Sequence, residues 1–161
     1  MLKRAIRKKV IVAATVGDVW AAWTTEEGVK TFFAPQANVD LAISGRYEMF
    51  FNPDAPVGSQ GGKGLRILSY QPEEMLSFEW NAPPEYPTVR QEKTWVVIQF
   101  EAQSPDSTHV VLTHLGWQEG GEWDQVYDYF VRAWDVVMGC LQHRFSVGVI
   151  DWRDPYRPPG T

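Results

Sequence analysis

The sequence predicts an α+β fold in which a curved antiparallel sheet of about seven strands wraps around one long C-terminal helix, with two short helices after the first strand. Three observations lead to this prediction. In the last third of the chain, large apolar residues recur every three or four positions, as they do on one face of a helix. In the middle, apolar and polar residues alternate between turns rich in Pro and Gly, which is typical of antiparallel strands. Near the start, two helix N-terminal signatures follow each other directly.

The first strand and the two short helices are predicted before Pro35. Residues 5–14 read as a strand, and the basic residues between Lys3 and Lys9 are of the kind that protects an edge strand from pairing with other chains. Thr15–Asp18 and Thr24–Glu27 each place a hydroxyl three residues before a carboxylate, so each is expected to open a short helix. Pro35 ends the second helix, because a residue that precedes Pro avoids the α conformation.

The remaining strands are separated by turns and loops. Residues 52–62 and 82–90 are rich in Pro and Gly, and we expect a long hairpin loop and a mobile loop there. A single domain is predicted over residues 1–150, followed by a Pro-rich tail over 151–161 that lies extended on the surface. The six further strands are predicted over residues 39–41, 46–51, 64–70, 75–80, 94–102 and 108–117.

A long helix is predicted from Glu122 to Phe145, with a buried stripe built largely from rings. Alternation along the strands places Trp80, Ile98 and Leu112 on the inner face of the sheet, where this helix would cover them. The stripe consists of Trp123, Val126, Tyr127, Phe130, Val131, Trp134, Val137, Met138, Leu141 and Phe145.

Composition and spacing argue against several classes of protein. The net charge of −5 argues against a nucleic-acid partner, and the longest apolar runs are too short to cross a membrane. Cys140 is the single cysteine, which excludes an internal disulfide, and we expect a cytoplasmic protein. His109 and His114 are five residues apart on a strand and therefore face opposite sides, and only Cys140 and His143 share a helix face. We therefore expect neither a metal site nor a cofactor.

Several segments resemble the START-like (SRPBCC) superfamily, which has the helix-grip fold, and within it the branch similar to the C-terminal domain of the activator of the heat-shock chaperone ATPase. The resemblance extends over about residues 5–147. It implies a ligand-binding domain, although most members of this branch have no assigned substrate. The residues that carry it are VWAAWTTEEG at 19–28, FFAP at 32–35, LSFEW at 76–80, THVVLTHLGW at 108–117, and Phe130, Trp134 and Leu141 in the last helix.

His114 is the polar residue of most interest, because alternation points it toward the covering helix. A histidine in this place can act as a general acid or base, or can bond a ligand. It can also be structural, held by a backbone carbonyl or by Thr94 across the hairpin. If the domain is an enzyme, the superfamily implies a cyclase or hydrolase that works without a cofactor, with His114 as acid or base. The sequence assigns no other catalytic residue.

The ring stripe favours a binding protein, with a hydrophobic or aromatic small molecule held between the long helix and the concave sheet. The resemblance implies an alternative, an interaction module in the stress response that contacts a chaperone. The activator works through an additional N-terminal domain, which this chain is not expected to have. Exposure of Trp95, Val97 and Val111 on the outer face would favour a homodimer. The predicted ligand-binding residues are Trp80, Thr94, Ile98, Leu112, His114, Trp123, Val126, Tyr127, Phe130 and Trp134.

Overall fold

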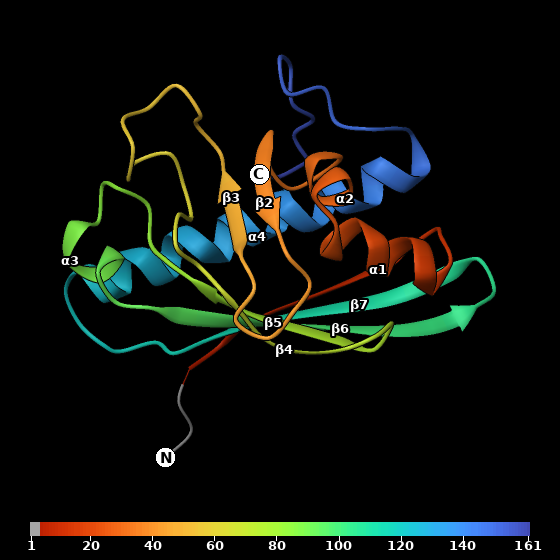
Figure 1. Cartoon of the computed structure of the whole chain (residues 1–161), viewed down its shortest axis with the longest axis horizontal. Coiled ribbons are helices and arrows are strands. Elements are labelled where there is room, and N and C mark those ends of the chain that lie inside the picture. Colours follow the sequence, from red (N-terminus) through yellow and green to blue (C-terminus); the bar gives the residue numbers. More distant parts are fainter. Residues whose placement is uncertain (1–3) are drawn as a thin grey trace.

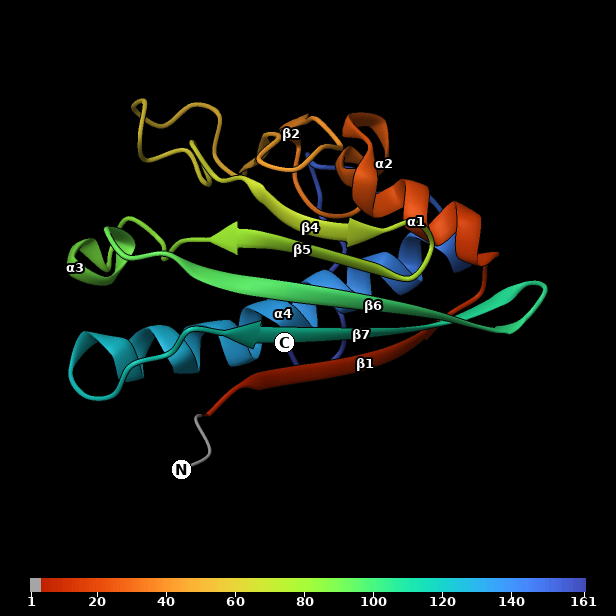
Figure 2. The ribbon, with the colours of Figure 1, turned by 60° about the horizontal axis from the view of Figure 1, so that its bottom comes forward.

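One long helix lies along one face of an antiparallel sheet, as the sequence predicts (Figure 1, Figure 2). The computed structural model describes residues 4–161, so Lys3 of the predicted basic group lies outside the described residues. The strands are β1 (Ile6–Val12), β2 (Gln36–Val39), β3 (Tyr47–Phe50), β4 (Ile67–Gln71), β5 (Met75–Trp80), β6 (Thr94–Ser104) and β7 (Ser107–Leu115). The helices are α1 (Val16–Thr24), α2 (Glu26–Lys30), α3 (Pro87–Arg90) and α4 (Glu122–Ser146). This arrangement confirms the α+β helix-grip fold.

The strands form a main sheet with a two-stranded extension. The main sheet has the order β1-β7-β6-β5-β4, and every neighbouring pair is antiparallel. β2 and β3 form their own antiparallel pair, which a bridge between Arg46 and Arg66 joins to the segment before β4. β1 lies at the edge of the main sheet, as its basic residues suggested, and the Gln142 side chain of α4 donates to the Ile11 carbonyl at 3.1 Å.

The inner face of the main sheet has the predicted residues. Ile98 lies between Leu112 and Leu76 in the register of the three central strands, and all three are fully buried. On the outer face Trp95 is 43% exposed, whereas Val111, expected to be exposed, is only 8% exposed. Its neighbours in register are Lys9 and Gln99, whose long side chains flank it and can cover its methyl groups.

The two short helices are capped by threonines and pack against each other. The Thr15 hydroxyl accepts from the Asp18 amide at 3.1 Å, which confirms the first predicted cap. The second cap is Thr25, one residue later than the spacing suggested, and its hydroxyl accepts from the Gly28 amide at 2.9 Å. A Cβ at Gly28 would overlap the main chain of Ala21 and Ala22 in α1, so the close approach of the two helices needs glycine there.

α4 is buried on two sides. Toward the sheet it buries Val126, Phe130, Trp134, Met138 and Leu141, whose spacings of four and three confirm the predicted stripe. Cys140, outside this stripe, is also buried, because the segment after α4 folds back onto the helix and contacts it. The remaining predicted stripe residues are only partly buried, namely Trp123, Tyr127, Val131, Val137 and Phe145.

The loop over 82–90 contains a turn of helix where a mobile loop was predicted. Pro87 occupies the first position of α3, where a missing N–H costs nothing. Val89 is buried, and its amide donates to the Glu122 carboxylate at the start of α4. This contact fixes the loop to α4. Its two residues are 33 positions apart, so a local sequence pattern does not reveal it.

We expect Gly28→Ala to lower the free energy of unfolding by about 1–3 kcal/mol, because the new methyl group would overlap backbone that has no room to move. Gly17→Ala in α1 is the matched control. The nearest atom there is the flexible Glu73 carboxylate at 3.0 Å, and alanine is a better helix former than glycine by up to about 1 kcal/mol. Urea unfolding of both variants checks this, and equal stability of the two would contradict it.

Candidate functional site

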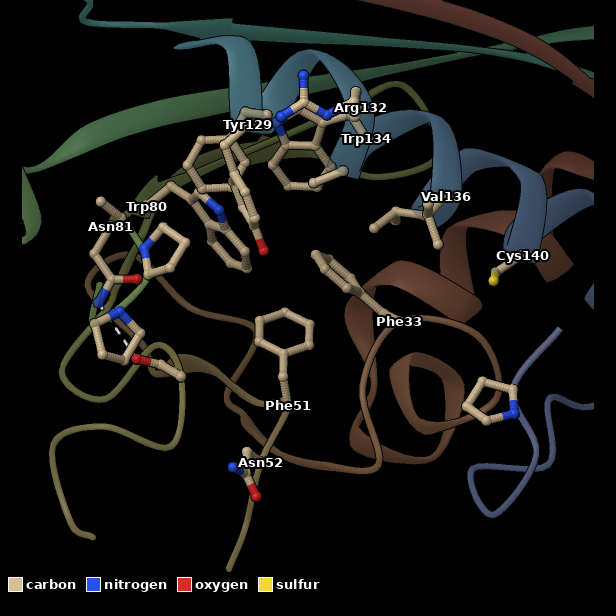
Figure 3. Close-up of a pocket in the computed structure, with 18 of the residues that line it drawn as sticks. Phe33, Phe51, Asn52, Trp80, Asn81, Tyr129, Arg132, Trp134, Val136 and Cys140 are labelled. Carbon is tan, nitrogen blue, oxygen red and sulfur yellow. Dashed lines mark hydrogen bonds between the residues drawn. The ribbon is translucent and has the colours of Figure 1, made fainter. Parts of the chain in front are cut away.

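A cavity of about 710 Å³ lies beside α4, on a side of the helix that the main sheet does not cover. Its other walls are the end of β5, the loops that follow β3 and β5, the segment after α2, and the C-terminal segment. Figure 3 shows Trp80, Phe33 and Phe51 around a common space below α4. The aromatic lining residues are Phe32, Phe33, Phe51, Trp80, Tyr129, Phe130, Trp134, Trp152 and Tyr156.

Three rings form the floor of the cavity. The ring centroids of Trp80 and Trp134 are 5.4 Å apart, and Phe33 lies 5.5 Å from Trp80 and 6.0 Å from Trp134. Phe51 packs edge-on to Trp80 at 6.1 Å but is 46% exposed, so it stands at the mouth. Rings that are fixed by their neighbours offer flat surfaces for stacking at little cost in conformational entropy.

A group of polar side chains lies at one end of the cavity. Asn52 and Asn81 lie there in Figure 3, and the Asn81 amide donates to the Gly61 carbonyl at 3.3 Å. Arg90 joins the two loops, since it donates to the carbonyls of Ala82, Gly58 and Gly61, the last at 2.8 Å. Partial burial lowers the pKa of Arg90, and within residues 4–161 its guanidinium pairs with no carboxylate. Its positive charge is therefore compensated only by carbonyl dipoles.

His114 lies under the floor of the cavity and does not line it. It is fully buried, with Trp117 at 4.5 Å and Phe130 at 5.1 Å between ring centroids. The Trp134 indole N–H donates to His114 Nδ1 at 2.9 Å, and His114 Nε2 lies 2.7 Å from Thr94 Oγ1. An indole N–H can only donate, so Nδ1 is unprotonated and Nε2 carries the proton that it gives to Thr94.

This network fixes the charge of His114 as well as its tautomer. Burial lowers the pKa of His114 to about 3. Protonation of Nδ1 would also turn the hydrogen bond from Trp134 into a clash of two donors. Thr94 in turn donates to the Trp80 carbonyl at 3.4 Å, so no group of the network is left to exchange a proton with the cavity.

The structure divides the predicted ligand-binding residues between the cavity and the core. Trp80, Phe130 and Trp134 line the cavity. The others lie outside its lining, either buried in the core or partly buried against it; they are Thr94, Ile98, Leu112, His114, Trp123, Val126 and Tyr127.

Several lining residues have no counterpart among the predicted ones. On α4 these include Arg132 and Val137 and a set spaced four, three and four apart beside the main stripe, namely Tyr129, Ala133, Val136 and Cys140. That spacing is a second helical face and was readable in the sequence. The contributions of Phe33, Phe51 and the C-terminal segment depend on long-range packing and left no local signal.

The described part of the chain has neither a metal-binding cluster nor a membrane span. Within residues 4–161 no three His, Cys, Asp or Glu side chains come together at a distance suited to a metal ion. His114 points inward, while His109 on the same strand is on the outer face and half-buried. No described helix has the length and apolarity that crossing a bilayer requires.

The family of the chain follows from a match that covers most of it. Residues 13–145 match the model of the family described as activator of Hsp90 ATPase homolog 1-like proteins. The chain belongs to this family. No curated protein matches the chain.

Solved structures of similar fold agree with this membership. Protein MLL2253 from Mesorhizobium loti is 16% identical, with a TM-score of 0.69, over 87% of this chain and 95% of that protein. The Aha1 dimer from Colwellia psychrerythraea is 18% identical, with a TM-score of 0.69, over 91% of this chain and 98% of the other. DynU16, a protein in the dynemicin biosynthetic locus, is 18% identical, with a TM-score of 0.67, over 98% of this chain and 51% of its own length. At these identities the likeness shows the fold alone.

We expect the stability of the protein to fall between about pH 6.5 and pH 3 through His114. Unfolded His114 takes up a proton near its ordinary pKa of 6.5, whereas the folded form does so only near 3. The unfolded state therefore binds more protons in this window, and stability is lost at up to about 1.4 kcal/mol per pH unit as the pH falls. Urea unfolding from pH 7 to pH 5 measures this slope.

His114→Leu is the matched comparison, because both proteins retain His109, His143 and every carboxylate. The variant is expected to be less stable at pH 7, since the Trp134 indole N–H loses its acceptor. Its pH slope is expected to be shallower than that of the wild type. Parallel slopes for the two proteins would contradict the assignment of a neutral His114.

Proposed function

We propose that this domain binds a flat, hydrophobic or aromatic small molecule in the cavity beside α4. The observation that carries the proposal is the cavity itself, about 710 Å³ in volume with nine aromatic residues in its lining. Ligand pockets in proteins are roughly 300–1,000 Å³, mostly apolar, with a few polar groups that orient the ligand. Here the lining combines these rings with the polar side chains of Asn52, Asn81 and Arg90.

The charges around the cavity favour a neutral or anionic ligand over a cationic one. Its lining contains Arg90, Arg132 and Arg157 but only one acidic residue, Glu85, although the whole chain has a net charge of −5. A local excess of one sign raises the concentration of oppositely charged ligands at a cleft. A carboxylate or a phenolate on the ligand would meet the charge of Arg90 at the polar end, of Arg132 on α4 or of Arg157 in the C-terminal segment.

A reaction catalysed by His114 fits the geometry less well than binding does. The ring is buried below Trp134, and both of its nitrogens are hydrogen-bonded within the core. Burial raises the pKa of two lining groups, Tyr129, where Glu85 adds to the effect, and Cys140. The lining groups that could act as acid, base or nucleophile are Glu85, Tyr129, Cys140 and Tyr156. Each would suit ligand contact as well as chemistry, so the cyclase or hydrolase hypothesis has no feature of its own in its favour.

Homodimerisation through the outer face of the sheet is a second proposal. Trp95 is 43% exposed there, and the Colwellia psychrerythraea protein of similar fold is described as a dimer. Sedimentation of the wild type and of Trp95→Lys checks it, with a dimer expected only for the wild type. Contact with a chaperone stays a prediction from the family's name.

Titration with the anionic dye 1-anilinonaphthalene-8-sulfonate tests the binding proposal. We expect saturable binding to the folded wild type, and binding weakened at least tenfold by Ala133→Phe, because the new ring would occupy the cavity. Phe51→Ala is expected to weaken binding about two- to tenfold, through the loss of one aromatic contact.

Trp95→Ala is the control for Phe51→Ala, since both side chains are aromatic and nearly half exposed but only Phe51 lines the cavity. Thermal unfolding of each variant shows whether it is folded. Absence of saturable binding to the wild type, or equal affinity in the wild type and Ala133→Phe, would overturn the proposal.

A further inference from the structure

The C-terminal segment Ile150–Thr161, here called the strap, forms one wall of the cavity. Figure 1 shows this part of the chain in dark blue, folding back from the C-terminal end of α4. Its cavity-lining residues are Trp152, Pro155, Tyr156, Arg157 and Thr161. The family match ends at residue 145, so the strap lies beyond the matched residues.

The first anchor of the strap is the end of α2. Ile150 is buried, and its amide donates to the Thr31 carbonyl at 2.9 Å. The Trp152 indole N–H donates to the Lys30 carbonyl at 2.7 Å. These bonds satisfy carbonyls at the end of a helix, which otherwise lack partners.

The second anchor is the outer side of α4. The Tyr156 ring stacks on His143 with 4.0 Å between centroids and 18° between planes, and the Tyr156 carbonyl accepts from Cys140 Sγ at 3.6 Å. Pro158 sits directly on Gly139, where a Cβ would overlap the proline ring. Glycine inside a helix costs about 1 kcal/mol relative to alanine, and contact with the strap gives a reason for it here.

The strap is held by these few contacts and not by a sheet or helix. Three hydrogen bonds among the described residues join it to the rest of the chain, at Ile150, Trp152 and Tyr156. Segments with few bonds of this kind open locally without unfolding the domain. Trp152 and Tyr156, one at each anchor, both line the cavity.

From this placement we infer that the strap is a detachable wall that determines selectivity, and that Trp152 and Tyr156 set the size of ligand the cavity accepts. The inference rests on the proposed binding function. With the strap seated, these two rings limit the cavity at the end opposite Asn52 and Arg90. With the strap displaced, that end opens to solvent and larger ring systems fit.

Gly139→Ala tests whether the strap can detach, and it leaves every residue of the strap unchanged. The substitution favours the helix, and its methyl group can be accommodated only if Pro158 moves away. Gly148→Ala is the matched control, because a Cβ there meets nothing within 4 Å. Gly139→Ala combined with Pro158→Gly removes the overlap and is expected to let the strap seat again.

Cys140, the single cysteine of the chain, reports directly on the strap, which covers its sulfur. Burial also raises the pKa of its thiol, so the seated state contains little of the reactive thiolate. We expect labelling of Cys140 by a thiol reagent to be at least tenfold faster in Gly139→Ala than in the wild type. Gly148→Ala and the double variant are expected to stay within about threefold of the wild type, and circular dichroism confirms that each protein is folded.

Selectivity is measured as the ratio of dissociation constants for a two-ring probe, 2-naphthoate, and a four-ring probe, 1-pyrenebutyrate. Gly139→Ala and Tyr156→Ala are expected to shift this ratio at least fivefold toward the larger probe, while Tyr156→Phe, which keeps the ring, is not. An unchanged rate of Cys140 labelling in Gly139→Ala would overturn the inference that the strap is a detachable wall. Faster labelling with an unchanged ratio overturns its role in selectivity. Failure of the wild type to bind either probe overturns the proposed function and this inference together, and is distinct from both other results.

Discussion

The hydrogen bond from the Trp134 indole to His114 is the contact on which the rest of the structure depends. It joins the middle of α4 to β7, and through Thr94 and the Trp80 carbonyl it reaches β6 and β5. A buried polar chain of this kind stabilises a fold only if each member has a partner, and here each donor meets an acceptor. The chain therefore fixes the rotation of α4 about its own axis.

That rotation decides which residues line the cavity. With the Trp134 N–H aimed at the sheet, one side of the indole packs on Phe130 while Phe33 and Trp80 pack around it from the cavity. The face of α4 that carries Tyr129, Ala133 and Val136 is then left without a sheet to cover it. The loops after β3 and β5 and the strap lie over this face instead. These irregular segments pack less closely on α4 than a sheet would, and the space between them and the helix is the cavity.

The sequence was sufficient for the framework and insufficient for the site. Helical and strand periodicities are local, so the stripe through Phe130, Trp134 and Leu141 and the inner face through Ile98 and Leu112 were both predicted correctly. Two details failed where local signals compete. Thr24 and Thr25 are both suitable caps, but Thr24 is the last residue of α1 and its hydroxyl donates to the Trp20 carbonyl, so Thr25 caps α2. Residues 82–90 looked mobile because their order comes from Glu122, which is remote in the sequence.

The sequence did not reveal that a second side of α4 borders a cavity, for a related physical reason. Rings such as Trp123 and Tyr127 have the same periodicity whether they meet a ligand or a sheet, and burial of apolar area stabilises both arrangements equally. The alternation that correctly pointed His114 inward also placed it in the core, where Thr94 and Trp134 satisfy both of its nitrogens. The sequence predicted that Thr94 could hold the His114 ring, and the structure has this hydrogen bond. It did not predict the hydrogen bond from Trp134, because no pattern in the sequence relates Trp134 to a strand residue 20 positions earlier.

The cavity is bounded by a framework, the sheet and α4, and by a cover, the loops after β3 and β5 and the strap. This division explains how one fold can serve different ligands. The His114 network lies behind the cavity floor and borders the cavity through Trp80, Phe130 and Trp134, none of which belongs to the covering loops. Phe51, Arg90 and the strap are held by a few hydrogen bonds and by ring packing, which are fewer and more easily exchanged than the bonds of the sheet register. Variation in binding is therefore expected to accumulate in the cover, while the floor of Phe33, Trp80 and Trp134 is constrained by the stability of the domain itself.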